Sequence, residues 1–367
     1  MSLVIVKSHY YDKIYQMNLR VLYLFAGQRR KLYEEYKNDK ASDIHLVGFN
    51  RMADYNIEAT FLENRLTEFL RKISFNLTQL PVLFRLHSCD VIFSGSGILT
   101  LFIVKYILRL KKPKWIIYNT YLTNLLKRNS SGFKGWVVKK AIFSADAIMS
   151  PSLAQQDFLR SIGFPTEKNY YVPYGIDYNF YDKDTRVSEI SERFIFSTGR
   201  DVGRDYKTLI EAVKGLPVKL IIAALPRNLE NVGELPPNVK VLYLKRTETP
   251  PFLKKSEFVV ITTIPEGKMA GSDCSGQYSL LESMSCAKAV ITTDRATLKG
   301  YFKGDEDGII VAPENVAELK EAIMSLWNNP QKAKIMGEAG RNKVRSQFTM
   351  EIFSRKLAEI FREVSTR

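Results

Sequence analysis

Short apolar runs alternate with stretches of helical spacing along most of the chain. Such runs predict strands, and apolar residues that recur every three to four positions predict helices. The strand-like runs lie at residues 20–25, 44–49, 89–94, 115–118, 145–152, 194–197, 218–223, 239–244, 258–263 and 289–292. The helical patterns lie at residues 61–84, 98–110, 132–143, 206–213, 319–327, 330–348 and 350–364. This alternation predicts an α/β fold whose parallel sheets are covered by helices on both faces.

The alternation restarts after residues 171–177, where Pro173 and Gly175 interrupt the pattern and predict a linker. A chain of 367 residues is long enough for two domains, each with its own core. Residues 1–19 show no clear period, so they form either an extension or an additional strand.

The formal net charge of +15 is concentrated in the first half of the chain. Residues 1–180 hold 25 Lys and Arg against 14 Asp and Glu, and residues 91–145 hold ten bases and no acid. Such a field attracts polyanions, either a membrane surface or nucleic acid, and the alternative is that the charge serves solubility. We expect an anionic membrane surface to be the partner of residues 91–145, and nucleic acid to be the less suitable one.

The predicted helix over residues 132–143 combines aromatic and basic side chains, among them Phe133, Trp136 and Lys139. A helix of this composition can lie at a membrane interface. The alternative is a surface helix whose apolar face packs on its own domain.

Targeting and redox features predict a cytoplasmic protein that associates peripherally with the membrane. No apolar run reaches the length of about 20 residues that a membrane span needs. Lys7, Asp12 and Lys13 interrupt any signal-peptide pattern. The three cysteines are widely spaced, which fits neither a disulfide framework nor a metal site and favours a reducing compartment.

One stretch, residues 273–291, combines a short loop with a helical pattern and a strand-like end. Ser275, Gly276 and Gln277 precede an apolar helix that carries one acid, Glu282. The first N–H groups of a helix lack intrahelical partners and attract anions, and a glycine lets a diphosphate approach the backbone. A ribose is a natural partner for the acid. The alternative is an ordinary helix–strand unit with one solvated glutamate.

Further motifs occur in a fixed order around this stretch. Gly175 lies in the linker, Gly199 and Arg200 follow the strand at 194–197, Arg204 precedes a helix, and residues 307–311 follow the stretch. In this order and spacing, residues 145–350 resemble retaining GT-B glycosyltransferases of the family 4 type. The resemblance implies two Rossmann-like domains that face each other across a cleft. It divides the chain into an acceptor domain (1–172), a nucleotide-sugar domain (173–348) and a last helix (349–367) that crosses back to the first domain.

The resemblance also implies a donor site. Arg200 and Arg204 would hold the diphosphate, although the family usually has lysine at the second position, and Glu282 would bind the ribose. Arginine suits phosphate oxygens because its guanidinium donates in a fork. These three residues are the expected catalytic set. The other expected donor-binding residues are Gly27, Gly199, Asp273, Ser275, Gly276, Gln277, Tyr278, Ser279 and Leu280.

One position departs from the family pattern. Two glutamates usually stand eight residues apart, and Cys274 occupies the place of the first. Asp273 or Glu266 could substitute for it, and Gln277 could hydrogen-bond sugar hydroxyls. The mode of sugar binding is therefore open.

The first half matches the family less closely. Asn119 and Thr120 stand where the family often has a histidine near the reacting carbon, and they are expected on the acceptor or sugar side. His9, His45 and His87 do not follow the right strand, so each is expected to be structural. No base is required if the departing phosphate accepts the proton of the acceptor.

The predicted function is retaining transfer of a hexosyl group from a nucleotide sugar, UDP-sugar rather than GDP-sugar, to a glycan or a lipid-linked acceptor. No tightly bound cofactor and no metal are expected, because residues 305–307 have a D-x-D pattern that is better explained as a turn. The alternatives are a non-catalytic binding subunit with the same fold and a sugar-nucleotide epimerase.

Overall fold

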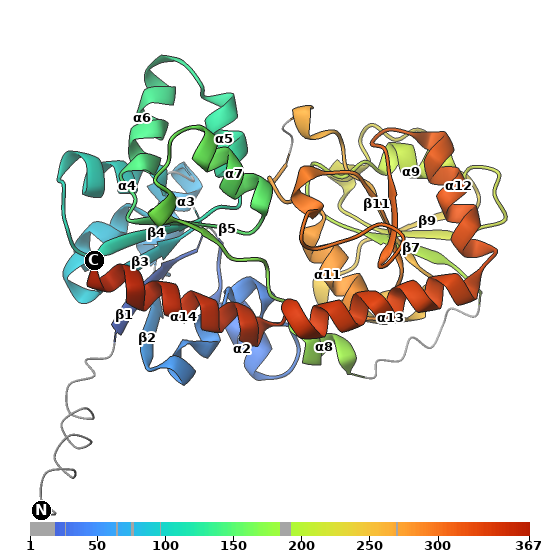
Figure 1. Cartoon of the computed structure of the whole chain (residues 1–367), viewed down its shortest axis with the longest axis horizontal. Coiled ribbons are helices and arrows are strands. Elements are labelled where there is room, and N and C mark those ends of the chain that lie inside the picture. Colours follow the sequence, from blue (N-terminus) through green and yellow to red (C-terminus); the bar gives the residue numbers. More distant parts are fainter. Residues whose placement is uncertain are drawn as a thin grey trace, which may run out of the picture.

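The computed structural model describes residues 19–25, 27–63, 65–74, 77–95, 97–183, 192–268 and 271–367. The segment 1–18, for which an extension or an additional strand was expected, lies outside these residues. The described chain forms two α/β domains that lie side by side (Figure 1). Among the described residues, no helix has both the length and the apolar composition that crossing a membrane requires.

The first sheet has the order β2-β1-β3-β4-β5-β6, and its neighbouring strands are parallel. Its strands are β1 (Leu19–Leu24), β2 (Ile57–Phe61), β3 (Val91–Ser94), β4 (Lys114–Tyr118), β5 (Ala147–Ser150) and β6 (Asn169–Tyr171). Its α-helices are α2 (Arg30–Lys37), α3 (Arg65–Ile73), α4 (Ile98–Leu101), α5 (Leu122–Arg128), α6 (Gly132–Phe143) and α7 (Leu153–Ser161). Its other helical segments include η1 (Ile44–Leu46), η2 (Phe49–Tyr55), η4 (Leu80–Ser88) and the π-helical η5 (Phe102–Ile107).

The second sheet also has six parallel strands, in the order β12-β11-β10-β7-β8-β9. Its strands are β7 (Ile195–Thr198), β8 (Leu220–Ala223), β9 (Val239–Leu242), β10 (Val259–Ile261), β11 (Val290–Thr293) and β12 (Gly308–Val311). The helices from the linker onward are α8 (Tyr178–Asp182), α9 (Tyr206–Val213), α10 (Pro250–Lys255), α11 (Gln277–Ser285), α12 (Val316–Trp327), α13 (Pro330–Gln347) and α14 (Met350–Thr366). The predicted α/β class with parallel sheets is confirmed.

One predicted strand is wrong. Residues 44–49 form η1 and a turn, because Val47 and Gly48 both adopt positive φ, 52° and 75°. An extended strand cannot contain two such residues in succession. The strand that lies beside β1 at the edge of the sheet is β2, whose alternate residues Glu58 and Thr60 are exposed. Strand β2 was not predicted, because its mixed polar and apolar residues do not form an apolar run.

The linker and the last two helices connect the domains. The backbone N–H of Ile176 donates to the carbonyl of Phe348 over 2.7 Å, and the N–H of Met350 donates back to Ile176 over 3.0 Å. A Cβ at Gly175 would lie 2.7 Å from the Cβ of Phe353, so only glycine permits this approach. Helix α13 lies under the second domain and α14 under the first (Figure 1). There the ring of Phe361 contacts Phe93 with centroids 5.2 Å apart. The domain boundaries stay a prediction.

Candidate functional site

The motifs of the second domain gather at the carboxyl ends of its strands, the edge where ligands bind in open parallel sheets. Gly199 follows β7, and Gly276 immediately precedes α11. The side chain of Ser279, in the first turn of α11, donates to the carbonyl of Thr198 at the end of β7 over 3.0 Å. This bond fixes the start of α11 beside the turn at Gly199. The two glycines and the helix start are thereby brought together.

The guanidinium of Arg204 lies between these two glycines. A Cβ on Gly199 would meet its Nε at 2.7 Å, and a Cβ on Gly276 would meet its Nη1 at 3.2 Å. Arg204 is only 5% exposed, and its Nη2 donates to the hydroxyl of Ser197 over 3.4 Å. Its Nε and Nη1 have no hydrogen-bond partner among the described residues. Buried N–H groups of a cation are costly to leave unpaired, so this arrangement suits an anion.

The start of α11 presents further groups to the same place. Gly276 adopts φ 90°, a conformation that glycine takes without strain, and this turn lets α11 begin at Gln277. The hydroxyl oxygen of Ser275 is buried and has no hydrogen-bond partner within the described part of the chain. The first N–H groups of a helix bear partial positive charge. Together with Arg204, these groups form a cradle of the kind that holds phosphate. The side chain of Leu280 is buried in the core.

Glu282 lies two turns along α11 and is half-buried. Its Oε1 accepts a hydrogen bond of 2.7 Å from the hydroxyl of Tyr181, which α8 supplies from the linker region. Burial raises the pKa of Glu282, and the Tyr181 hydrogen bond and the charges of Arg246 and Arg200 oppose that shift. Arg200 itself is half-buried and donates to the carbonyl of Leu244. One carboxylate and two arginines therefore share the outer part of the site.

Asp273 has its carboxylate turned toward the first domain. Its two oxygens accept the backbone N–H groups of Thr123 and Asn124 at the start of α5, over 2.9 and 3.0 Å. One of them also accepts from Nε2 of Gln155 over 3.1 Å. Burial raises the pKa of Asp273, and these hydrogen bonds oppose the shift. In this structure the carboxylate joins the two domains, so its expected donor-binding role stays a prediction.

Cys274 and Asn119 belong to the same buried network. The thiol of Cys274 lies 3.1 Å from Oε1 of Gln155, while Oδ1 of Asn119 accepts the N–H of Leu122 over 3.0 Å. The carbonyl of Thr120 accepts the N–H of Asp273 over 3.2 Å. Asn119 and Thr120 thus lie at the domain junction next to the loop that precedes α11. Burial raises the pKa of the Cys274 thiol, so the thiol itself does not supply the negative charge of the glutamate that is usual at this position.

Gln277, a predicted donor residue, and Glu266, a possible substitute for the first glutamate, both have partners within the second domain. Gln277 is buried and its amide donates to the carbonyl of Thr297. Glu266 lies beside Arg295, with 3.7 Å between Oε1 and Nε. Arg295 also donates to the carbonyl of Asp273 over 3.1 Å and therefore stabilises the loop that precedes α11.

The first domain contributes one residue that the sequence pattern assigned to structure. His45 lies on η1, and its ring contacts Tyr278 of α11 with centroids 5.3 Å apart. Burial lowers the pKa of His45 well below its usual value, as do the charges of Arg246, Arg29 and Arg200. A neutral imidazole therefore faces the arginines of the second domain. Neither His45 nor Tyr181 carried a sequence signal, because neither belongs to a motif and both reach the site only through the fold.

Gly27 lies in the loop before α2, next to Arg29, whose side chain a Cβ on Gly27 would meet at 2.9 Å. The acids of residues 305–307 form a turn, in which Asp307 pairs with Lys343 over 2.7 Å. Within the described part of the chain, no group of three or more His, Cys, Asp or Glu side chains gathers as metal ligands do.

Comparison with known proteins agrees with this geometry. Residues 182–343, which contain Gly199, Arg204, Gly276 and Glu282, match the model of the family described as glycosyl transferases group 1. This match places the group 1 resemblance in the second domain. The resemblance to group 1 glycosyltransferases expected from the motifs is thereby confirmed, whereas retention of configuration stays a prediction.

Curated proteins that are similar to this chain include glycosyltransferases. D-rhamnosyltransferase WbpZ of Pseudomonas aeruginosa is 25% identical over 281 residues, which cover 67% of this chain and 66% of WbpZ. The match therefore spans about two thirds of the length of that relative.

Solved structures share the architecture over nearly the whole chain. HepE of Anabaena in complex with UDP has a TM-score of 0.67 and 16% identity, and it covers 94% of this chain and 100% of HepE. Sucrose-phosphate synthase of Thermosynechococcus elongatus has a TM-score of 0.70 and 14% identity, and it covers 94% of this chain and 99% of the enzyme. The GT-B fold, with two Rossmann-like domains, is confirmed.

Proposed function

We propose that this protein transfers a sugar from a nucleotide-sugar donor to an acceptor, with retention of configuration and without a metal. The observation that carries the proposal is the buried guanidinium of Arg204, which has two unpartnered nitrogen atoms between Gly199 and Gly276. A diphosphate there would satisfy both nitrogen atoms. Negative charge grows on the leaving diphosphate as the glycosidic bond breaks, so fixed cations at this place lower the barrier.

The outer part of the site suits the nucleoside. Glu282 is held by Tyr181 and lies within the electrostatic reach of Arg200 and Arg246. We propose that its carboxylate accepts hydrogen bonds from the ribose hydroxyls. HepE has been solved in complex with UDP and with UDP-glucose, which favours UDP over GDP as the donor nucleotide of this chain.

The proposed transfer step requires no side chain as a base. The bond between the anomeric carbon and the diphosphate oxygen breaks, and a bond to the acceptor oxygen forms on the same face. The acceptor proton passes to an oxygen of the leaving phosphate. This route fits the described site, because burial and three arginines lower the pKa of His45 and make its imidazole a weak proton acceptor.

The acceptor is proposed to be a glycan or a lipid-linked molecule, presented by the first domain in the cytoplasm. The ten bases and no acids of residues 91–145 favour an anionic membrane surface as the place where the acceptor is met.

A thermal-shift screen of UDP, GDP and their sugar derivatives tests donor binding, because a ligand that binds only the native state raises the melting temperature. We expect UDP-sugars to stabilise the wild-type chain, and Arg204→Ala and Glu282→Ala to abolish that shift. Slow hydrolysis of a labelled UDP-sugar should disappear in both variants. Unchanged hydrolysis in both variants would contradict the assignment of Arg204 and Glu282 to the donor site. Conversion of the free donor to another sugar nucleotide would show an epimerase, and binding without hydrolysis or transfer would show a binding subunit.

A further inference from the structure

A surface of the first domain, far along the chain from the donor motifs, combines exposed rings with unpaired bases. Phe133 is 80% exposed and Trp136 is 44% exposed, and both belong to helix α6. The opposite face of α6 is occupied, because Val138, Ala141 and Ile142 are buried in the domain core. These buried residues attach the helix, so the exposed ring of Phe133 is not needed for that purpose.

These rings belong to an aromatic cluster that continues onto η5. Trp136 stacks against Phe133 with centroids 5.9 Å apart and meets Tyr106 edge-on at 5.7 Å. Ile107 and Leu108, at the end of the same segment, are 56% and 53% exposed. Helix α6 packs against both α4 and η5, so these side chains form one apolar surface. Exposed apolar surfaces of this kind mark membrane or protein contacts.

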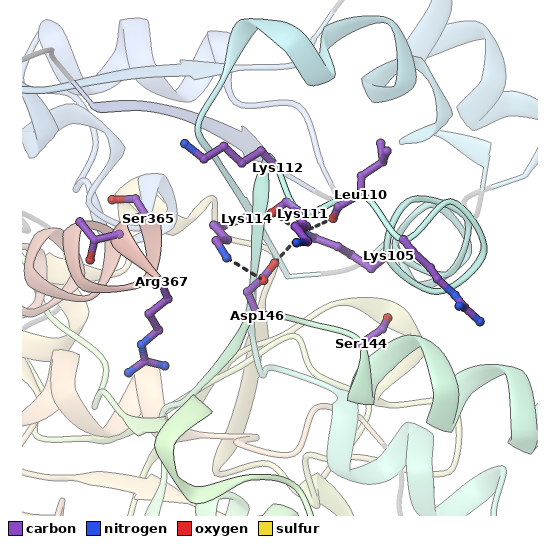
Figure 2. A pocket seen from close by; sticks show the side chains of 11 residues that line it. Lys105, Leu110, Lys111, Lys112, Lys114, Ser144, Asp146, Ser365 and Arg367 are labelled. Carbon is purple, nitrogen blue, oxygen red and sulfur yellow. Dashed lines mark hydrogen bonds and ion pairs between the residues drawn. The ribbon is translucent and has the colours of Figure 1, made fainter.

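A basic pocket adjoins the apolar surface where η5 ends. The cavity has a volume of about 730 Å³. Its lining includes Lys105, Arg109, Lys111, Lys112, Lys114, Arg367 and one acid, Asp146. Figure 2 shows that Asp146 is engaged by Lys105 and Lys114, over 2.7 and 3.6 Å. Among the described residues, Arg109, Lys111 and Lys112 have no ion-pair partner.

The position of the pocket separates it from the donor site. Lys114 begins β4, and Asp146 immediately precedes β5, so the pocket lies at the amino ends of the first sheet. The donor motifs lie at the carboxyl ends of the second sheet, across the domain junction. The pocket therefore does not belong to the site already described.

We propose that these two features form one docking face for an anionic bilayer: Phe133 and Trp136 enter the interface, and Arg109, Lys111 and Lys112 contact lipid phosphates. Aromatic side chains favour the membrane–water interface, and each base near an anionic surface strengthens binding. Charge complementarity selects the lipid, because residues 91–145 carry no acid that would repel it. The inference rests on the membrane surface of the proposed function and assigns residues to it.

Sedimentation of the full chain with vesicles tests the docking face. Binding to vesicles of phosphatidylcholine with phosphatidylglycerol should exceed binding to phosphatidylcholine alone and should weaken with salt. Phe133→Ser should lower the partition coefficient about tenfold, since it removes one inserted ring. The double variant Lys111→Glu, Lys112→Glu should lower it about 25-fold or more.

Matched controls lie on the second domain: Ile335→Ser, 61% exposed on α13, and the double variant Lys320→Glu, Lys334→Glu. Both should bind like the wild-type chain.

Tryptophan fluorescence gives a direct reading of insertion. Lipids with brominated chains should quench the wild-type chain, and Trp136→Phe should lose that quenching while still binding vesicles, because the ring is kept. Of the other two tryptophans, Trp115 is fully buried and Trp327 ends α12 of the second domain, away from the docking face, so neither should be quenched.

Several results would overturn the proposal: equal binding to neutral and anionic vesicles, equal effects of the docking-face and control variants, or preference for single-stranded nucleic acid over vesicles. The docking variants should keep the melting temperature and the donor-induced shift of the wild-type chain. Vesicle binding without any donor response would refute the transferase and leave the docking face intact. A donor response without vesicle binding would refute the docking face and leave the proposed transferase function intact.

Discussion

Two buried ionisable residues, Asp273 and Arg204, have opposite relations to their neighbours. Asp273, in the loop before α11, accepts hydrogen bonds from three donors, all from the first domain. Arg204, which lies beside Gly276 at the start of α11, has two nitrogen atoms with no hydrogen-bond partner among the described residues. What separates them is whether the protein already satisfies their hydrogen-bonding groups.

This difference separates a structural role from a ligand-binding one. A buried group with all its partners in place stabilises the fold, and removing it costs stability. A buried polar group without partners lowers the free energy of unfolding, and a ligand that binds to it can offset this loss. The comparison can be tested by substitutions that should affect either stability or donor binding, but not both.

The largest effect is expected for Arg204→Ala. Loss of a charged donor aimed at the leaving diphosphate should lower kcat/KM by about a hundredfold or more. The melting temperature without nucleotide should not fall, because an unpaired buried cation is removed. Kinetics with a UDP-sugar and a melting curve without ligand measure both effects. Arg204→Lys is the matched variant and should retain part of the activity. A large fall in stability would show that Arg204 is structural.

Asp273→Ala should show the reverse behaviour. It leaves the N–H groups of Thr123 and Asn124 buried without their acceptor, at a cost of about 2–3 kcal/mol. Urea denaturation should show this loss of unfolding free energy, while the affinity for UDP in calorimetry should change little. Asp273→Asn keeps an acceptor oxygen and should lose less. A loss of UDP affinity at unchanged stability would assign Asp273 to the donor after all.

The domain junction should also respond to pH. Burial and the neighbouring Asp43 raise the pKa of Asp177 to about 6. The folded state therefore binds this proton more tightly than the unfolded state, whose pKa is about 3.9. Its contribution to stability is complete below about pH 4 and is lost as the pH rises through about 6. Asp177→Asn should remove this contribution and still cap α8, because asparagine accepts the same N–H. Denaturation curves across this range check it, and identical pH profiles for the two proteins would contradict it.

The smallest effect is expected for Tyr181→Phe. The variant removes the hydroxyl that orients Glu282 and keeps the ring. A hydrogen bond to a charged group contributes about 1.5 kcal/mol or more, so KM for the donor should rise about tenfold with little change in kcat. Steady-state kinetics measure the split. Tyr243→Phe, at an exposed tyrosine of the second domain, is the control and should have no effect. A fall in kcat alone would place Tyr181 in the chemical step.

The predictability of the site follows the same division. Arg204, Gly276 and Glu282 belong to short motifs with local geometry, a glycine turn followed by a helix, so the sequence could identify them. Asp273 belongs to the same stretch, but its partners Thr123 and Asn124 lie about 150 residues away. Local pattern says nothing about such a partner.

The sequence by itself determined the alternation of strands and helices, the group 1 motifs and the excess of bases over residues 91–145. These features depend on local hydrophobic spacing, backbone preferences and composition. Tertiary structure alone decided that Asp273 joins the two domains, that Tyr181 and His45 reach α11, and that Phe133 stays exposed. The physical reason is that burial and hydrogen-bond partners arise from contacts between distant segments, and these form only when the two sheets and their helices are packed.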